Sequence, residues 1–137
     1  MSGSYDNTVR VWDTATGVKR RILKGHSDTV NTVAVSPDGQ FIISGSYNNN
    51  VRVWDTTIGT KRYVLKGYSD TVSAVAVSPN GRLIVSGSYD NNVRVWDIVT
   101  GAERRVLKGR LRAVSAVAVS PDGQFIVSGS YDNNVRV

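Results

Sequence analysis

His26 is the only histidine in the chain and therefore the first candidate for catalytic chemistry. A serine hydrolase needs a histidine that activates a nucleophilic serine, together with an oxyanion hole. Ser44 and Ser46 are candidate nucleophiles, but their "SGS" segment recurs along the chain with no second histidine to accompany it. Because these serines recur in units that have no histidine to activate them, we interpret them as structural residues. We therefore predict that the chain is not an enzyme.

The sequence also lacks the patterns of metal and phosphate sites. It has no cysteine, and no alternating run of oxygen ligands is closed by a glutamate as in a calcium loop. No glycine-rich segment leads into the Gly-Lys-Ser/Thr of a phosphate-binding loop. We expect no cofactor and no metal. Tight hairpin turns are predicted instead at Asp38-Gly39, Asn80-Gly81 and Asp122-Gly123.

The composition is that of a globular protein in water. Of the 137 residues, 40% are hydrophobic and 20% are charged, and no apolar run approaches the roughly 20 residues that span a bilayer. The absence of cysteine fits a reducing compartment. We therefore expect no membrane partner, a cytoplasmic location, and a single unit over residues 1–137.

One segment recurs at a fixed interval along the whole chain. "SGSYDNTVRVWD" begins at Ser2, and close copies begin at Ser44 and Ser86, each 42 residues after the last; a partial copy begins at Ser128. Such self-similarity is typical of repeat architectures. Copies this similar, with the same phrase at both ends, also suggest a recently amplified or engineered fragment of a longer protein.

Within each unit the apolar residues have a period of two, in short runs rich in Val and Ile. Such runs, separated by turn residues, predict four antiparallel strands per unit. In the unit that follows His26 the predicted strands cover residues 29–36, 40–47, 51–55 and 61–67.

These motifs resemble the WD-repeat β-propeller family. The Trp-Asp pair that ends the family's third strand recurs in three units, and "SPDG" begins at Ser36, with close counterparts later. The resemblance implies an all-β fold of four-stranded blades, about three per chain, and a non-enzymatic scaffold for protein interactions. The matching Trp-Asp pairs are Trp12-Asp13, Trp54-Asp55 and Trp96-Asp97.

The resemblance also implies a buried hydrogen-bond network in each blade, made of a histidine, a serine, an aspartate and the tryptophan. In the first complete unit the matching residues are His26, Ser44 or Ser46, Asn48 and Trp54, so the acid is missing. The second unit has Tyr68 in place of the histidine, with Asp90 and Trp96, and the third has Arg110 facing Asp132. No unit matches the network completely, and an ion pair between Arg110 and Asp132 is one expected compensation.

An arc of three blades would leave two apolar sheet faces in water. We therefore expect chains to join end to end until a ring closes. A homotrimer with nine blades is favoured over a homodimer with six, because crowding of the inner strands costs more than widening a channel. Two copies of the third strand then compete for one place. The N-terminal copy (Val9, Val11, Trp12) is expected to displace the C-terminal copy (Val135, Val137).

A candidate partner-binding face combines recurring tyrosines with a loop that differs between units. Arg110, Leu111 and Arg112 form a basic and apolar loop suited to acidic peptides or proteins. The tyrosines of this face are Tyr5, Tyr47, Tyr89 and Tyr131.

The net charge of +6 leaves a second function open, a basic surface for nucleic acid. The Lys and Arg residues gather on the predicted fourth strands, where they would also protect an exposed edge from stray pairing. We favour the protective interpretation over nucleic-acid binding.

Overall fold

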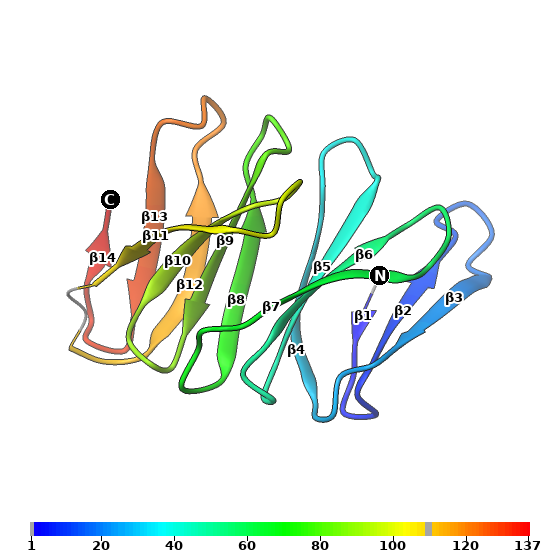
Figure 1. The fold of residues 1–137 in the computed structure, drawn as a ribbon, viewed down its shortest axis with the longest axis horizontal. Coiled ribbons are helices and arrows are strands. Elements are labelled where there is room, and N and C mark those ends of the chain that lie inside the picture. Colours follow the sequence, from blue (N-terminus) through cyan, green and yellow to red (C-terminus); the bar gives the residue numbers. More distant parts are fainter. Residues whose placement is uncertain (1, 109–110) are drawn as a thin grey trace.

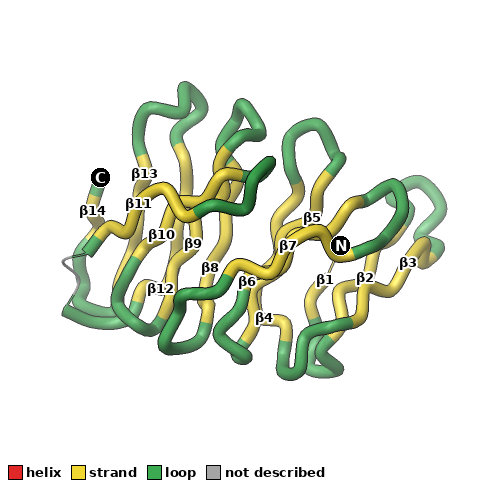
Figure 2. Tube along the Cα trace, in the orientation of Figure 1, coloured by secondary structure: helices red, strands yellow, loops and turns green. Residues whose placement is uncertain are grey.

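The computed structural model describes residues 2–108 and 111–137, and every regular element in these ranges is a β-strand (Figure 2). The strands form four antiparallel sheets. Figure 1 shows the sheets side by side in chain order, with the N-terminal sheet at one end of the row and the C-terminal sheet at the other. The predicted all-β fold of propeller blades is confirmed.

The two middle sheets are complete four-stranded meanders. In each, consecutive strands are neighbours, as the short turns of the sequence require. The first contains β4 (Val30–Val35), β5 (Phe41–Ser46), β6 (Val51–Asp55) and β7 (Lys61–Leu65). The second contains β8 (Val72–Val77), β9 (Leu83–Ser88), β10 (Val93–Asp97) and β11 (Glu103–Leu107).

The two end sheets have three strands each. The N-terminal sheet has a short remnant of a second strand followed by a third and a fourth strand, whereas the C-terminal sheet has a first, a second and a shortened third strand. Their members are β1 (Ser2–Gly3), β2 (Thr8–Trp12) and β3 (Lys19–Lys24), and β12 (Val114–Val119), β13 (Ile126–Ser130) and β14 (Val135–Arg136).

The turn between the second and third strands has the same backbone in all four sheets. Asn49 has a φ of 62°, and its three counterparts have φ between 66° and 70°. Asparagine tolerates this left-handed conformation better than most side chains do. The repeated Asn therefore fixes one hairpin geometry in each unit.

Adjacent sheets pack face to face through Val, Ile and Trp side chains. The contact is close because a glycine at the second-strand position of the first three sheets lies under a valine of the next blade. A Cβ on Gly45 would lie 2.6 Å from Cγ1 of Val72, and one on Gly87 would lie 2.5 Å from Cγ1 of Val114. Only glycine leaves room for this approach.

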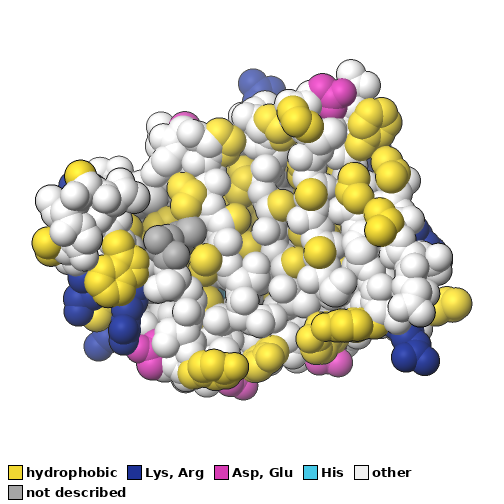
Figure 3. Space-filling view, turned by 180° about the vertical axis from the view of Figure 1, so that it is seen from behind, with side chains coloured by type: hydrophobic (Ala, Val, Ile, Leu, Met, Phe, Trp, Pro, Cys, Tyr) yellow, Lys and Arg dark blue, Asp and Glu magenta, His cyan; other side chains and the backbone are white. Residues whose placement is uncertain are grey.

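The end sheets leave exposed what the middle sheets bury. Trp12 is 39% exposed, although its counterparts Trp54 and Trp96 are 2% and 4% exposed. At the other end Val135 and Val137 are 70% and 84% exposed. On the face opposite that of Figure 1, apolar side chains are scattered over the surface and most of the visible basic ones lie toward its two ends (Figure 3).

Candidate interaction site

His26, Ser44 and Trp54 form a buried hydrogen-bonded group in the first complete blade. The indole Nε1 of Trp54 donates to Oγ of Ser44 at 2.8 Å, and Nε2 of His26 lies 2.7 Å from the same oxygen. Nδ1 of His26 is 3.4 Å from Oδ1 of Asn48. Of the two candidate serines, Ser44 takes this place, because Ser46 donates to the backbone oxygen of Asp28 instead.

This group is built for structure and not for hydrolysis. Burial, and then the charge of Arg52, lower the pKa of His26 to about 4, so the ring is neutral at pH 7. Ser44 is 0% exposed, so a substrate has no access to its hydroxyl. The histidine is held by an amide oxygen and not by a carboxylate that would stabilise its charged form.

The second blade builds the same group with a tyrosine. The hydroxyl of Tyr68 bonds to Oγ of Ser86, and Nε1 of Trp96 donates to both oxygens, at 2.8 Å and 3.1 Å. Burial raises the pKa of Tyr68, which therefore stays neutral. A phenol thus replaces the imidazole without leaving the serine or the tryptophan unpaired.

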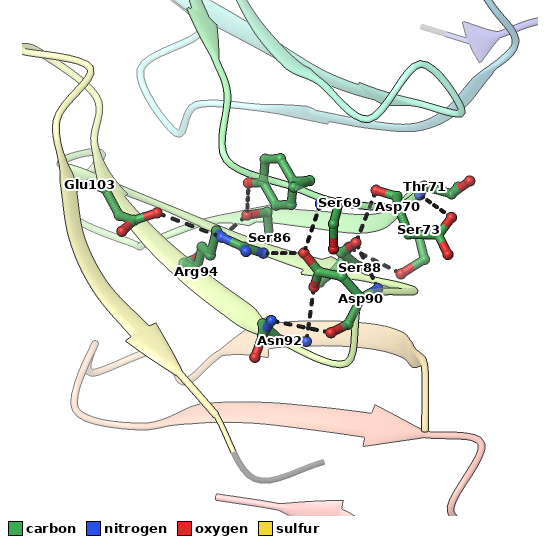
Figure 4. A network of polar contacts seen from close by, with 12 residues as sticks. Ser69, Asp70, Thr71, Ser73, Ser86, Ser88, Asp90, Asn92, Arg94 and Glu103 are labelled. Atoms are coloured by element: carbon green, nitrogen blue, oxygen red, sulfur yellow. Dashed lines mark hydrogen bonds and ion pairs between the residues drawn. The ribbon is translucent and has the colours of Figure 1, made fainter. Parts of the chain in front are cut away.

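Asp90 does not join the tyrosine group but pairs with Arg94 (Figure 4). Nη1 of Arg94 lies 2.8 Å from Oδ2 of Asp90, and Nε lies 3.6 Å from Oε2 of Glu103. The guanidinium also lies over the ring of Tyr68, 4.6 Å from its centroid. Sequence reasoning missed Arg94 and Glu103 as members of this cluster. The recurring spacing of four residues between the acid and the arginine was a signal for the first.

In the third unit Arg110 is the predicted partner of Asp132, and Arg110 lies outside the described residues. Asp132 lies 3.9 Å from Arg136, the arginine that follows it by four residues. This arrangement repeats the acid and arginine spacing of the second blade.

The four recurring tyrosines are exposed to solvent. Tyr5 is the most exposed at 88%, and Tyr89 and Tyr131 contact each other edge to face with ring centroids 6.2 Å apart. Leu111 is 82% exposed and Arg112 is exposed. Tyr47 is 41% exposed. The described part of the predicted partner face is therefore accessible.

The two copies of the third strand lie in the sheets at opposite ends of the chain (Figure 1). In the N-terminal copy Val9 is 0% exposed and Val11 is partly buried, and Gly3 pairs with Val9. In the C-terminal copy Val135 pairs with Gly129. Each copy thus occupies the place of a third strand in its own sheet.

Within residues 2–108 and 111–137 no three His, Cys, Asp or Glu side chains gather as metal ligands would. The same residues contain no helix long and apolar enough to cross a bilayer.

The repeated blades agree with comparisons to known proteins. The profile of the WD40 family (WD domain, G-beta repeat) matches residues 1–13, 17–55, 59–97 and 101–137. The chain belongs to the WD40 family. The first matched segment holds β1 and β2. Each later segment begins with the last strand of one sheet, β3, β7 or β11, and continues through the first three strands of the next sheet.

Several WD40 proteins are similar to this chain over about one repeat. Coronin-7 of Pongo abelii is 56% identical over 39 residues, which are 28% of this chain and 4% of coronin-7. Nuclear distribution protein PAC1 of Coccidioides posadasii is 46% identical over 43 residues, 31% of this chain and 9% of PAC1. Small ribosomal subunit protein RACK1y of Oryza sativa subsp. japonica is 48% identical over 44 residues, which are 32% of this chain and 13% of RACK1y. The matched part is thus a small fraction of each relative.

Proposed function

We propose that this chain is a non-enzymatic scaffold for protein interactions, located in the cytoplasm, whose blades complete a propeller by joining copies of the same chain. WD40 repeats across the chain support the scaffold role. The observation that carries the joining of chains is the complementarity of the two end sheets.

Each end sheet supplies the strands that the other lacks. The C-terminal sheet provides a first and a second strand, β12 and β13, and the N-terminal sheet provides a third and a fourth, β2 and β3. Placed together, these four strands match the order of the complete sheet β4-β5-β6-β7. The short copies β1 and β14 are then displaced.

The apolar surface left by the isolated arc favours this joining. Phe125 is 52% exposed and Trp12 is 39% exposed, and the third-strand valines at the C-terminus are more exposed still. Burial of apolar surface contributes roughly 25 cal/mol per Å². A contact that joins the tail of one chain to the head of the next repeats around a ring when its rotation closes.

We favour a homotrimer of about nine blades over a homodimer of about six. Closing a ring of fewer blades forces the inner strands β4, β8 and β12 together against steep repulsion. A wider ring only enlarges a central channel that water can fill.

We place partner binding on the candidate partner-binding face of the recurring tyrosines, where Tyr47, Tyr89 and Leu111 are accessible. The adjoining Arg112 gives this face a positive charge that suits acidic peptides or proteins. We do not extend the proposal to nucleic acid, because part of the basic rim is already paired. Arg104 lies 2.7 Å from Asp97, and Arg20 lies 3.6 Å from Asp13.

The mass of the particle in solution tests the proposal. Light scattering should give three times the chain mass of 14.9 kDa for a trimer or twice that mass for a dimer. A stable particle of 14.9 kDa at every concentration would overturn the joining of chains.

Two matched variants test which copy of the third strand is used. Trp12→Asp places a charge in the strand that we expect to enter the composite blade, and it should abolish the oligomer. Val135→Asp places the same charge in the copy that is displaced, and it should leave the oligomer intact. The opposite result would show that the C-terminal copy keeps its place.

A further inference from the structure

Arginines at the start of the third strand have the same position in all four sheets, and three of them pair with an aspartate four residues earlier. Arg10 pairs with Asp6, and Arg94 and Arg136 pair with their own aspartates. Arg52 differs, because Asn48 stands where the aspartate should be. The first complete blade therefore lacks the acid that neutralises this arginine elsewhere.

Arg52 also lacks the second acid that its counterpart has in the next blade. Glu103 lies opposite Trp96 in the sheet and approaches Nε of Arg94 to 3.6 Å. The residue at the same register position, opposite Trp54, is Lys61. Two carboxylates of the second blade are thus replaced in the first by an amide and a cation.

Among the described residues no carboxylate pairs with Arg52, and its buried Nε has no hydrogen-bond partner. Its guanidinium lies 5.9 Å from the ring centroid of Trp54. Burial lowers the pKa of Arg52, and its charge in turn helps to lower the pKa of His26. These features describe a partly buried positive charge that no carboxylate of the described residues neutralises, which is costly.

The guanidinium of Arg52 lies against the backbone near the place where a carboxylate lies in the second blade. A Cβ on Gly67 would lie 3.6 Å from Oε2 of Glu103. A Cβ on Gly25, the counterpart of Gly67, would overlap Nη1 of Arg52. The guanidinium of Arg52 has therefore turned toward the place that the Glu103 carboxylate takes in the other blade.

We propose that Arg52 and Lys61 form a binding site for an acidic side chain of a partner protein, whose carboxylate pairs with Arg52 as Glu103 pairs with Arg94 in the second blade. The second blade supplies the precedent, because the carboxylate of Glu103 lies beside Arg94 there. Hydrogen bonds between a guanidinium and a carboxylate are among the strong ones in proteins. The site lies within one blade, so it goes beyond the joining of chains and does not depend on it.

The test follows the Nε resonance of Arg52 by NMR while an acetylated triglutamate peptide is added at constant ionic strength. Arg52→Lys assigns the resonance by removing it. The peptide should shift this resonance to saturation in the original chain. Asn48→Asp restores the internal partner, so it should weaken peptide binding roughly tenfold or more. Asn50→Asp adds the same charge in the same turn and should leave binding unchanged.

Three outcomes would overturn the site. The first is that the peptide causes no saturable shift of the Arg52 resonance in the original chain. The second is that the Asn48→Asp variant binds the peptide as tightly as the original chain does, while its amide spectrum shows an intact fold. The third is tighter binding of inorganic phosphate than of the peptide at the same resonance, which would make this a phosphate site. None of these outcomes bears on the oligomeric mass, so the joining of chains is tested separately.

Discussion

The serine on the second strand is the constant member of the buried polar group, while its partner varies. Ser44 meets a histidine and Ser86 meets a tyrosine, yet each also accepts the indole N–H of its tryptophan. A buried polar group costs little when all its donors and acceptors are paired. The replacement of His26 by Tyr68 at the equivalent position keeps that condition, which explains why the two blades share a fold despite different chemistry.

The two serines should differ in what their removal costs. Ser44→Ala leaves Nε1 of Trp54 and Nε2 of His26 without their shared partner, and we expect a loss of about 1–3 kcal/mol in unfolding free energy. Ser86→Ala should cost less, because Nε1 of Trp96 still donates to the Tyr68 hydroxyl at 2.8 Å. Urea unfolding of both variants measures the difference. Equal losses would contradict the role given to the tyrosine.

The histidine also predicts how stability depends on pH. The pKa of His26 is lowered by burial from 6.5 to about 4 in the folded chain. Between these values the unfolded chain binds a proton that the folded chain does not, so unfolding free energy should fall as the pH drops from about 6.5 to about 4. The pKa of Asp97 is lowered to about 2, chiefly by a hydrogen bond from the backbone N–H of Thr100. Protonation of Asp97 therefore affects stability only below this pH range.

His26→Tyr is the matched control, since it copies the arrangement found at Tyr68. It keeps a partner for Ser44 and removes the group that titrates in this range. Its unfolding free energy, measured by urea at pH 7 and at pH 4.5, should change less than that of the original chain. The prediction fails when both chains lose stability equally.

At the scale of the strand, the decisive residue is the glycine that receives a valine from the next blade. A methyl group at Gly87 would lie 2.5 Å from Cγ1 of Val114 and 3.1 Å from its Cβ. Gly87→Ala should therefore separate β9 from β12 and cost about 1–3 kcal/mol by overpacking. Thermal unfolding measures this cost. Gly123→Ala does not serve as its control, because a positive φ of 72° strains any side chain there.

Much at the scale of the strand was predictable from sequence. The period of two predicted the strands, because alternate residues face opposite sides of a sheet, and the 42-residue interval predicted that the sheets repeat. The sequence shows Asn48 where the other units have an acid, but it does not predict that Arg52 lacks a carboxylate partner. Sequence reasoning assigned that acid to His26, whereas Asp90 pairs with Arg94 in the structure. Which of two nearby groups an acid serves depends on side-chain geometry that spacing alone does not define.

At the scale of the whole molecule, the row of blades is uniform in its contacts but not at its ends. In the chain itself Gly3 of β1 lies under Val30, so that a Cβ there would be 2.8 Å from Cγ1 of the valine. Gly129 has the same position in the C-terminal sheet, but a Cβ on it would meet only Oγ of Ser115 at 3.6 Å and Cβ of Ala116 at 3.9 Å. The proposed joining of chains would seat Gly129 of one copy on Val30 of the next.

This difference separates folding of the chain from assembly of the ring. Gly129→Ala should leave thermal unfolding of the isolated arc unchanged, because distances of 3.6 Å and 3.9 Å are ordinary contacts. It should nevertheless abolish the oligomer, since the added methyl would overlap Val30 of the next copy as a Cβ on Gly3 would within one chain.

Gly3→Ala is the reciprocal variant. It distinguishes the formation of a composite blade from nonspecific hydrophobic association of the end sheets. Its methyl strains the isolated arc, where β1 lies under Val30, but β1 is displaced in the proposed ring, so the oligomer should persist. Light scattering on both variants measures the particle mass. An oligomer that survives Gly129→Ala would mean that the end sheets meet in some way other than as a composite blade.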